Sequence, residues 1–259
     1  MMGARGRRGA CSVAAVLLTL LTPLTAPAHA CGSQRLGEGS IAAIEDHRTL
    51  SLADGRKIRL AGIEWGVAAD IARPVLSDLL LGRTIALKGT GTPDRYGRIH
   101  AFASVNGSET PIQYVLLDRG LAVAGTRIGD AACRHALLER ERSARKARLG
   151  IWGSGDYRLH QADDPAAILQ SVGRFAIVEG RVLSVRESGN TVYVNFGRRW
   201  SDDFTVTIAK RAEATFISAG LSPRSLAGRV VRVRGVIEER SGPWIEATAA
   251  DQFEWDGPR

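Results

Sequence analysis

One short stretch constrains the fold of this chain more than any other. Residues 58–63 read Ile-Arg-Leu-Ala-Gly-Ile, with an arginine facing one way and apolar residues the other. Alternation of this kind predicts a β-strand with one buried face. Asp54-Gly55 lies just before it and is a strong signal for a tight turn between two strands. The sequence therefore predicts short strands joined by tight turns in this part of the chain.

The pattern extends over a first region that covers residues 40–152. Apolar spacing and turn residues predict strands, then a helix, a strand pair and two further helices. The expected strands cover residues 40–44, 49–52, 57–63, 84–87 and 99–105, and the expected helices cover residues 68–81, 112–119 and 133–149. Pro74 is expected in the first turn of its helix, where the missing N–H does no harm.

A second patterned region covers residues 173–256. Its expected strands cover residues 175–185, 191–196, 204–208, 230–237 and 244–247, with a helix over residues 209–220. Three strands, a helix and two strands are the order of an OB-fold, a small Greek-key barrel. Residues 153–172 are expected to form a linker between the regions, because residues 153–165 are rich in Gly, Asp and Ser.

The first 30 residues have the parts of a secretory signal peptide. Arg5, Arg7 and Arg8 precede an apolar core at residues 13–21, and residues 28–30 supply small residues for cleavage. We therefore expect a periplasmic or secreted protein, with no transmembrane segment after the signal. Cleavage lowers the formal net charge of +8 by three, and the remaining positive excess weakly favours an anionic partner.

Two cysteines remain after the signal, Cys31 and Cys133. An even pair in an exported protein suggests one disulfide, which would tie the mature N-terminus to the helix near residue 133. The alternative is a lipid anchor on Cys31, because that residue follows the cleavage site directly.

A second arginine motif accompanies the strand at residues 58–63. Residues 94–98 read Asp-Arg-Tyr-Gly-Arg, a turn that presents Arg98. A guanidinium group is a planar fork of donors that fits phosphate oxygens and stays charged near neutral pH. If Arg59 and Arg98 converge on one pocket, they form a clamp for a phosphodiester.

The first region resembles the thermonuclease, or staphylococcal-nuclease-like, family. The residues that carry the resemblance are 49–52, 58–63, 94–98, 115–122 and 150–152, in the order of the family. The resemblance implies an α+β, mainly β fold with an OB-type five-stranded barrel and packed helices. It also implies cleavage of DNA or RNA with Ca²⁺. Arg59 and Arg98 would bind the phosphate, and Tyr96 would contact the nucleic acid.

The acidic residues depart from the family pattern. Glu64 occupies the position of a metal-binding aspartate, Arg48 the position of another, and Val67 the position of the general base. Glutamate can still bind Ca²⁺ through oxygen, whereas a nearby arginine repels the ion and valine accepts no proton. Loss of a general base alone slows such a reaction on the order of 10²–10⁴-fold. Hydrolysis is therefore expected to be weak or altered.

Other side chains near the motif could replace the missing groups. Glu45, Asp46 and Asp70 are carboxylates that could reach the vacated positions, and His47 or His100 could act as a base. The alternative is that all of them are ordinary surface residues. No paired Cys or His spacing of a zinc site is present.

Basic and aromatic residues elsewhere allow two interpretations each. The helix over residues 134–148 carries six cations with Glu139 and Glu141 between them. It could follow a phosphate backbone, or it could be a solvated face with internal salt bridges. The second region combines aromatic residues with arginines, as a single-strand platform does, or as a barrel with aromatics in its core and arginines outside. These residues are Tyr193, Phe196, Trp200, Phe204, Trp244, Arg198, Arg199, Arg232 and Arg234.

Three functions remain open from the sequence. The first is a protein that engages nucleic acid through Arg59 and Arg98, with weakened hydrolysis. The second is a non-catalytic module that binds nucleic acid or another polyanion. The third is an envelope protein that keeps only the fold.

Overall fold

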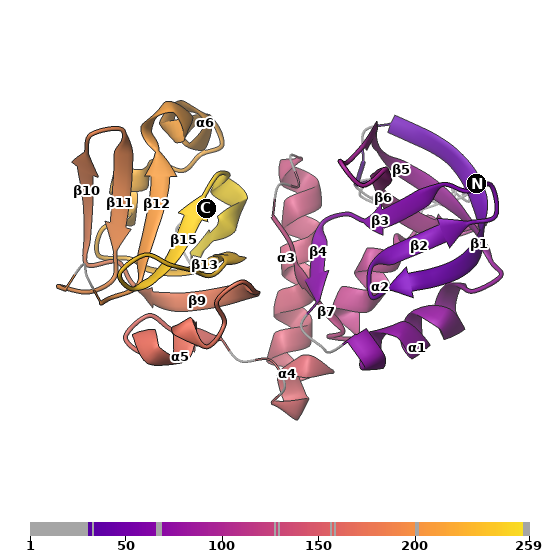
Figure 1. Ribbon diagram of the computed structural model, residues 1–259, viewed down its shortest axis with the longest axis horizontal. Helices are drawn as coiled ribbons and strands as arrows, with labels where there is room; N and C mark the ends of the chain where they lie inside the picture. The colour runs from indigo at the N-terminus through magenta and orange to yellow at the C-terminus, as the bar shows by residue number, and fades with distance from the viewer. Residues whose placement is uncertain are drawn as a thin grey trace, which may run out of the picture.

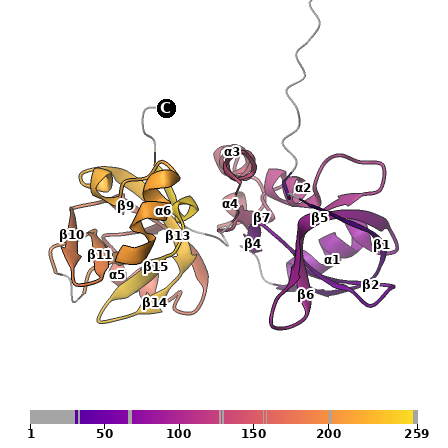
Figure 2. The same ribbon diagram turned by 90° about the horizontal axis from the view of Figure 1, so that it is seen from above.

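The computed structural model describes residues 31–255, except residues 33, 66–68, 127, 129, 156, 158, 200 and 201 and the side chains of residues 69–72. The expected signal peptide, Val67, Trp200 and the side chain of Asp70 lie outside the described residues. The described chain forms two lobes with helix α3, Ala131–Lys146, between them (Figure 1). The view from above shows the same arrangement (Figure 2).

The first lobe is a closed barrel with the strand order β1-β2-β3-β6-β5. Its strands are β1 (Gln34–Asp46), β2 (Thr49–Leu52), β3 (Lys57–Leu60), β5 (Thr84–Pro93) and β6 (Arg98–Val105). β3 and β6 pair in parallel, and the other neighbours pair antiparallel. Alternate residues such as Leu50, Ile58 and Leu87 are fully buried inside. The expected mainly β fold with a five-stranded barrel is confirmed.

The expected strand over residues 57–63 is divided in two. β3 ends at Leu60, and the chain continues as β4 (Ile63–Trp65), which pairs with β7 (Ala122–Ala124) outside the barrel. The break lies at Gly62, whose φ is +73°. A side chain there would also collide with Phe102, 2.9 Å from an added Cβ. Glycine is therefore required where the chain leaves the barrel.

Helices cover the barrel on one side. α1 (Ala69–Leu80), α2 (Ile112–Asp118), α3 and the short α4 (Ile151–Ser154) follow in chain order. Pro74 lies inside α1 rather than in its first turn, because the helix begins well before it at Ala69. The N-cap of α3 is Asp130, which accepts a hydrogen bond from the Cys133 backbone N–H. Cys133 forms a disulfide with Cys31, which ties the start of the described chain to α3.

The described strands of the second lobe form a five-stranded sheet and a four-stranded sheet. β10 (Ser184–Ser188), β11 (Thr191–Asn195) and β12 (Thr205–Ala209) pair antiparallel in turn, and β12 pairs in parallel with β15 (Pro243–Ala247). β9 (Phe175–Arg181) pairs antiparallel with β13 (Val230–Val236), and β14 (Glu238–Glu239) pairs with β15. α6 (Glu213–Ser218) lies between β12 and β13 in the chain, and β16 (Phe253–Trp255) extends the β13 sheet.

The expected linker at residues 153–172 is partly built into the second lobe. β8 (His160–Gln161) adds to β9 in parallel, and α5 (Pro165–Leu169) follows it. Ile168 of α5 is fully buried in the core of this lobe. Because the segment is mostly polar, its composition did not indicate that Ile168 is a core residue.

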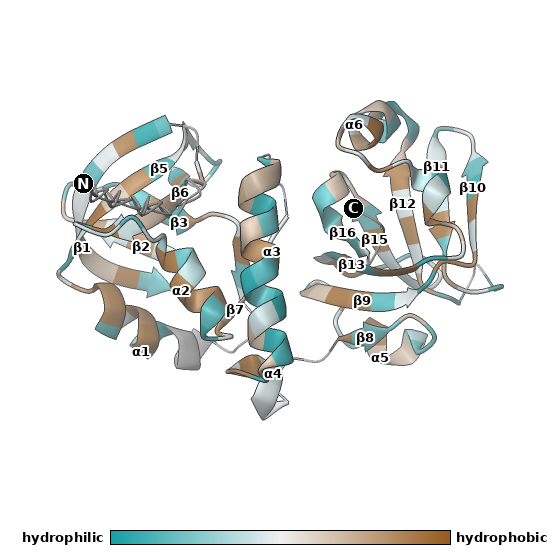
Figure 3. Ribbon diagram, turned by 180° about the vertical axis from the view of Figure 1, so that it is seen from behind, coloured by the Kyte–Doolittle hydropathy of each residue, from teal (hydrophilic) through white to brown (hydrophobic). Residues whose placement is uncertain are grey.

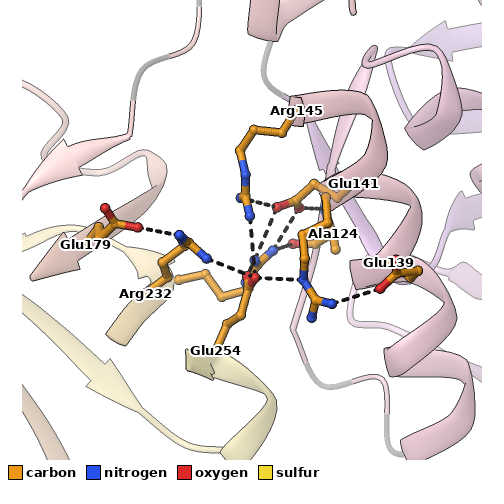
Figure 4. A network of polar contacts seen from close by, with 9 residues as sticks. Ala124, Glu139, Glu141, Arg145, Glu179, Arg232 and Glu254 are labelled. Carbon is orange, nitrogen blue, oxygen red and sulfur yellow. Dashed lines mark hydrogen bonds and ion pairs between the residues drawn. The ribbon is translucent and has the colours of Figure 1, made fainter. Parts of the chain in front are cut away.

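A buried ionic network joins α3 to the second lobe. Arg234 of β13 is fully buried and donates to Glu141 of α3 at 2.9 Å, to Glu254 of β16 at 2.9 Å and to the Ala124 carbonyl at 2.8 Å. Glu141 also accepts a hydrogen bond from the Ala124 N–H at 2.6 Å. These partners come from both lobes and meet at one point (Figure 4). The network therefore fixes one lobe against the other.

Further arginines surround Glu254. Arg142 and Arg145 of α3 donate to its carboxylate at 3.1 and 3.4 Å, and Arg232 of β13 donates at 3.2 Å. Burial alone would raise the pKa of Glu254, but the arginines, with Arg234 foremost, hold it below its ordinary value. This carboxylate stays charged inside the interface.

The network bears on two expectations. The basic helix is neither a phosphate track nor a solvated face along Glu141, which is buried against the second lobe. The arginines of β13 face away from the core of their own lobe, as expected, but Arg234 is covered by α3 and is fully buried. Seen from behind, α3 is mostly hydrophilic along its length between the lobes (Figure 3). Its residues Glu141, Arg142 and Arg145 pair with the second lobe, whereas Glu139 and Lys146 of the same helix are exposed.

No helix in the described part of the chain is long and apolar enough to cross a membrane.

Candidate phosphate site and interdomain cleft

The candidate site lies across three neighbouring strands of the first barrel. Thr49 of β2 is opposite Arg59 of β3, and Arg59 is opposite His100 of β6. The residues on either side of Arg59, Ile58 and Leu60, are buried inside the barrel. The period of a strand therefore turns Arg59 outward, as the sequence predicts.

A tight turn at the end of β1 holds one side of this site. Asp46 accepts hydrogen bonds from the Arg48 backbone N–H at 2.8 Å and from the Thr49 hydroxyl at 2.9 Å. Burial would raise the pKa of Asp46, but these two hydrogen bonds, aided by nearby cations, lower it below its ordinary value. Asp46 is thus an ionised carboxylate whose oxygens are already engaged by the turn.

Arg59 is anchored through one nitrogen. Its Nη1 donates to the Thr49 hydroxyl at 3.1 Å and lies 3.7 Å from the Asp46 carboxylate. Within the described residues, Nε and Nη2 have no hydrogen-bond acceptor, and neither is buried from solvent. Two donors of this guanidinium are therefore open to a ligand.

Arg98 is held by the turn that precedes β6. Asp94 accepts from the Arg98 side chain at 2.9 and 2.7 Å, and from the backbone N–H groups of Tyr96 and Arg98. The side-chain bonds from Arg98 are the main reason that the pKa of Asp94 lies far below its ordinary value. Tyr96 is exposed, with Arg95 and Arg98 each 4.8 Å from its ring centre. Arg98 is thus rigidly placed, and much of its donor capacity is used internally.

The positions expected to hold a cation contain an ion pair instead. Arg48 forms a salt bridge with Glu64 of β4, and its Nη1 also lies 3.4 Å from the Ile63 carbonyl oxygen. The carboxylate of Glu64 is therefore paired with the guanidinium of Arg48. A charged guanidinium at this point repels a metal ion by Coulomb's law.

Three arginines share this edge of the barrel. Burial is the main reason that the pKa of Arg59 is lowered, and the positive charges of Arg48 and Arg98 lower it further. Each arginine lies near one carboxylate, Glu64, Asp46 or Asp94, so these six side chains carry no net charge. The site offers an anion the open donors of Arg59 rather than a positive excess.

A calcium ion does not fit the described residues. Ca²⁺ takes six to eight oxygen ligands, mostly carboxylates and carbonyls. No group of three or more His, Cys, Asp or Glu side chains in the described residues is arranged to hold a metal. Glu64 is paired with Arg48, and Asp46 is engaged by its own turn. The resemblance implies calcium, but these residues do not provide its site.

The expected substitute bases have other contacts. His47 packs edge-on against Trp65, with ring centres 5.8 Å apart, and burial lowers its pKa. His100 lies 3.3 Å from the Asp94 carboxylate. Glu45 is bound by Ser51 and Lys57 on the surface.

A cleft of about 870 Å³ lies between the two lobes beside these arginines. Arg48, Arg59 and His100 line the wall from the first lobe. The opposite wall comes from the second lobe and includes Phe175, Val236, Glu238, Glu246, Thr248 and Gln252. No local motif predicts this wall, because its residues lie more than a hundred positions from Arg59 and meet it only after folding. Arg98 does not line the cleft.

Comparison with known proteins gives one family. Residues 56–154 match the model of the staphylococcal nuclease homologue family, from just before β3 to the end of α4. A search of curated proteins found no match to this chain. The matched range contains Arg59, Glu64 and Arg98, and this family is one of nucleases and nucleic-acid-binding domains. The resemblance in the sequence is confirmed: residues 56–154 of this chain form a staphylococcal-nuclease-like domain.

Proposed function

We propose that this protein binds nucleic-acid phosphates at the edge of its first barrel and does not cleave them by a calcium-assisted route. The observation that carries the proposal is the ion pair between Arg48 and Glu64. It replaces a negative metal-binding pair by a neutral one, while Nε and Nη2 of Arg59 keep no acceptor among the described residues. Binding of an anion is favoured by this change, whereas catalysis through a cation is not.

Arg59 is the central binding residue of the proposal. It lines the cleft, and two of its donors are open. Bidentate donation to a phosphate oxygen pair suits a guanidinium of this kind. Arg98 adds positive charge beside it, and Tyr96 offers an exposed ring to a neighbouring sugar or base. Both roles are part of the proposal.

Cleavage needs a group that activates water. Val67 would occupy the general-base position, but it lies outside the described residues. Among described side chains, Glu64 is neutralised by Arg48, and Asp46 has a lowered pKa and accepts from its own turn. A carboxylate with a lowered pKa is a weak base. These features support binding without efficient hydrolysis.

Export belongs to the same proposal. The disulfide between Cys31 and Cys133 is of the kind that persists in oxidising compartments. The protein would then meet nucleic acid outside the cytoplasm.

Fluorescence anisotropy with labelled single-stranded DNA tests the proposal. Arg59→Ala is expected to weaken binding about tenfold to a hundredfold, because it removes charge-assisted hydrogen bonds. Arg229→Ala is the matched control, since this arginine is exposed on the second lobe and does not line the cleft. Binding should also weaken as salt rises, because phosphate contacts release counterions. Equal affinity of the two variants would contradict the proposal.

A further inference from the structure

A second hollow lies on the outer face of the second lobe. It measures about 960 Å³ and is lined by Tyr193, Trp244, Arg186, Arg198 and Arg240 among others. The rings of Tyr193 and Trp244 meet edge to face, with centres 6.0 Å apart. Arg186 and Arg198 are exposed and have no ion pair with any carboxylate that the structure describes. Aromatic rings with free arginines form the kind of surface on which single-stranded bases stack.

Strand geometry places both rings outside the core. Val192 and Val194 flank Tyr193 and are fully buried, so Tyr193 faces outward. Ile245 of β15 is also fully buried, which turns Trp244 and Glu246 to the outer face. The hydrophobic core of this lobe therefore needs neither Tyr193 nor Trp244.

The hollow adjoins the interdomain cleft along β15. Trp244 lines the hollow and Glu246 lines the cleft, two residues apart on one face of the strand, which is about 7 Å. Arg240 joins the two spaces: its Nη2 lies 3.4 Å from Glu246, and its guanidinium lies 5.2 Å from the Trp244 ring centre. The same side chain also pairs with Glu238 of the cleft wall at 2.7 Å.

The charges along this path are not uniform. At one end the cleft has Arg48 and Arg59, and at the other end the hollow has Arg186 and Arg198. Between them Arg240 pairs with Glu238 and Glu246 and offsets one of their two negative charges, and Glu187 of the hollow is paired with Lys210 and Arg224. Phosphates are favoured at the two ends, and bases at the aromatic middle.

We infer that the cleft and the hollow form one track for a single-stranded nucleic acid, with phosphate contacts at Arg59 and base stacking on Trp244 and Tyr193. This inference rests on the proposed function of the arginine site. A duplex does not suit the track, because its bases are already paired and stacked and cannot lie on the two rings.

Two oligonucleotide lengths separate this inference from the proposed function. A labelled oligothymidine of about 3 nucleotides is shorter than the roughly 4–16 nucleotides that one barrel site covers and reaches the arginine site alone. One of about 15 nucleotides is long enough to reach the hollow as well. The longer probe is expected to bind more tightly than the shorter one to the unmodified protein. Arg59→Ala should weaken both probes.

The aromatic variants act on the longer probe only. Tyr193→Ala and Trp244→Ala are each expected to weaken it about fivefold to a hundredfold and to leave the shorter one unchanged. Arg186→Ala with Arg198→Ala removes exposed charges without touching the core and should lower the salt dependence of the longer probe. Arg229→Ala is the control, because this arginine is exposed, lines neither the hollow nor the cleft and has no ion pair with a described carboxylate.

The outcomes are distinct. If the two probes bind equally, or if the aromatic and arginine variants change nothing for the longer one, the track is refuted while the arginine site stands. Equal affinity for a duplex of the same length also refutes it. If neither probe binds, both the track and the proposed function are wrong.

Discussion

Replacement of Arg234 by methionine tests the junction between the two lobes. The side chain is fully buried and makes four hydrogen bonds, to both oxygens of Glu141, to Glu254 and to the Ala124 carbonyl. Methionine fills a similar volume but removes the positive charge that Arg234 places beside the carboxylates of Glu141 and Glu254. Burial alone would lower the pKa of Arg234, yet Glu141 and Glu254 raise it above its ordinary value, so the ion pairs outweigh the burial.

The expected loss follows from the partners that remain. Removing one member of a buried ion pair costs about 3–5 kcal/mol. Glu254 keeps three arginines, and Glu141 keeps Arg145 at 3.1 Å and the Ala124 N–H. The loss in the free energy of unfolding should therefore lie near the lower end, about 3 kcal/mol. Arg224→Met removes an exposed ion pair and should cost less than about 1 kcal/mol.

Urea denaturation followed by circular dichroism and tryptophan fluorescence measures both variants. A double variant, Arg234→Met with Glu141→Gln, should lose less than the sum of the two single losses, because it removes the uncompensated charge and keeps an acceptor for the Ala124 N–H. A loss below about 1 kcal/mol for Arg234→Met, or full additivity in the double variant, would refute this view of the junction.

Three further predictions concern the site and the disulfide. Arg48→Asp should create a carboxylate cluster with Glu64, so that millimolar Ca²⁺ raises the melting temperature of the variant but not of the unmodified protein; equal shifts would contradict the ion-pair account. Burial lowers the pKa of His47 from its ordinary value near 6.5. The neutral ring therefore makes its whole contribution to the free energy of unfolding above that pH, and the contribution falls as the pH drops below it. A His47→Gln variant should lose this part of the pH dependence in thermal melts. The disulfide joins residues 102 positions apart. Replacing Cys31 by serine should therefore lower the free energy of unfolding by about 2–5 kcal/mol, and a denaturation midpoint unchanged by the substitution would be inconsistent with a disulfide that constrains the unfolded chain.

The local parts of the fold and site could be predicted from the sequence. Alternation around Arg59 indicates both the strand and the outward direction of this arginine, because the period of a strand is fixed. The turn that presents Arg98 is equally local: Asp94 organises it by accepting backbone and side-chain hydrogen bonds over four residues. The break in the strand at Gly62 could not be predicted, since a glycine inside an apolar strand pattern does not by itself indicate a positive φ.

The long-range parts could not be predicted. Arg234 has the strand position of an outward residue, and only the position of α3 in the folded chain shows that this outward face is buried against another lobe. The pairing of Arg48 with Glu64 likewise joins the end of one strand to a separate sheet. Charge and periodicity identify which residues face away from a core, but not what covers them.

The most direct test of the account is a single experiment with labelled single-stranded DNA, incubated with the purified protein in Ca²⁺ or in EDTA. Binding and cleavage are measured on the same samples. The account predicts equal binding and uncut DNA under both conditions, with binding lost in Arg59→Ala. Calcium-dependent cleavage that is abolished by Arg59→Ala and by Arg98→Ala would contradict it.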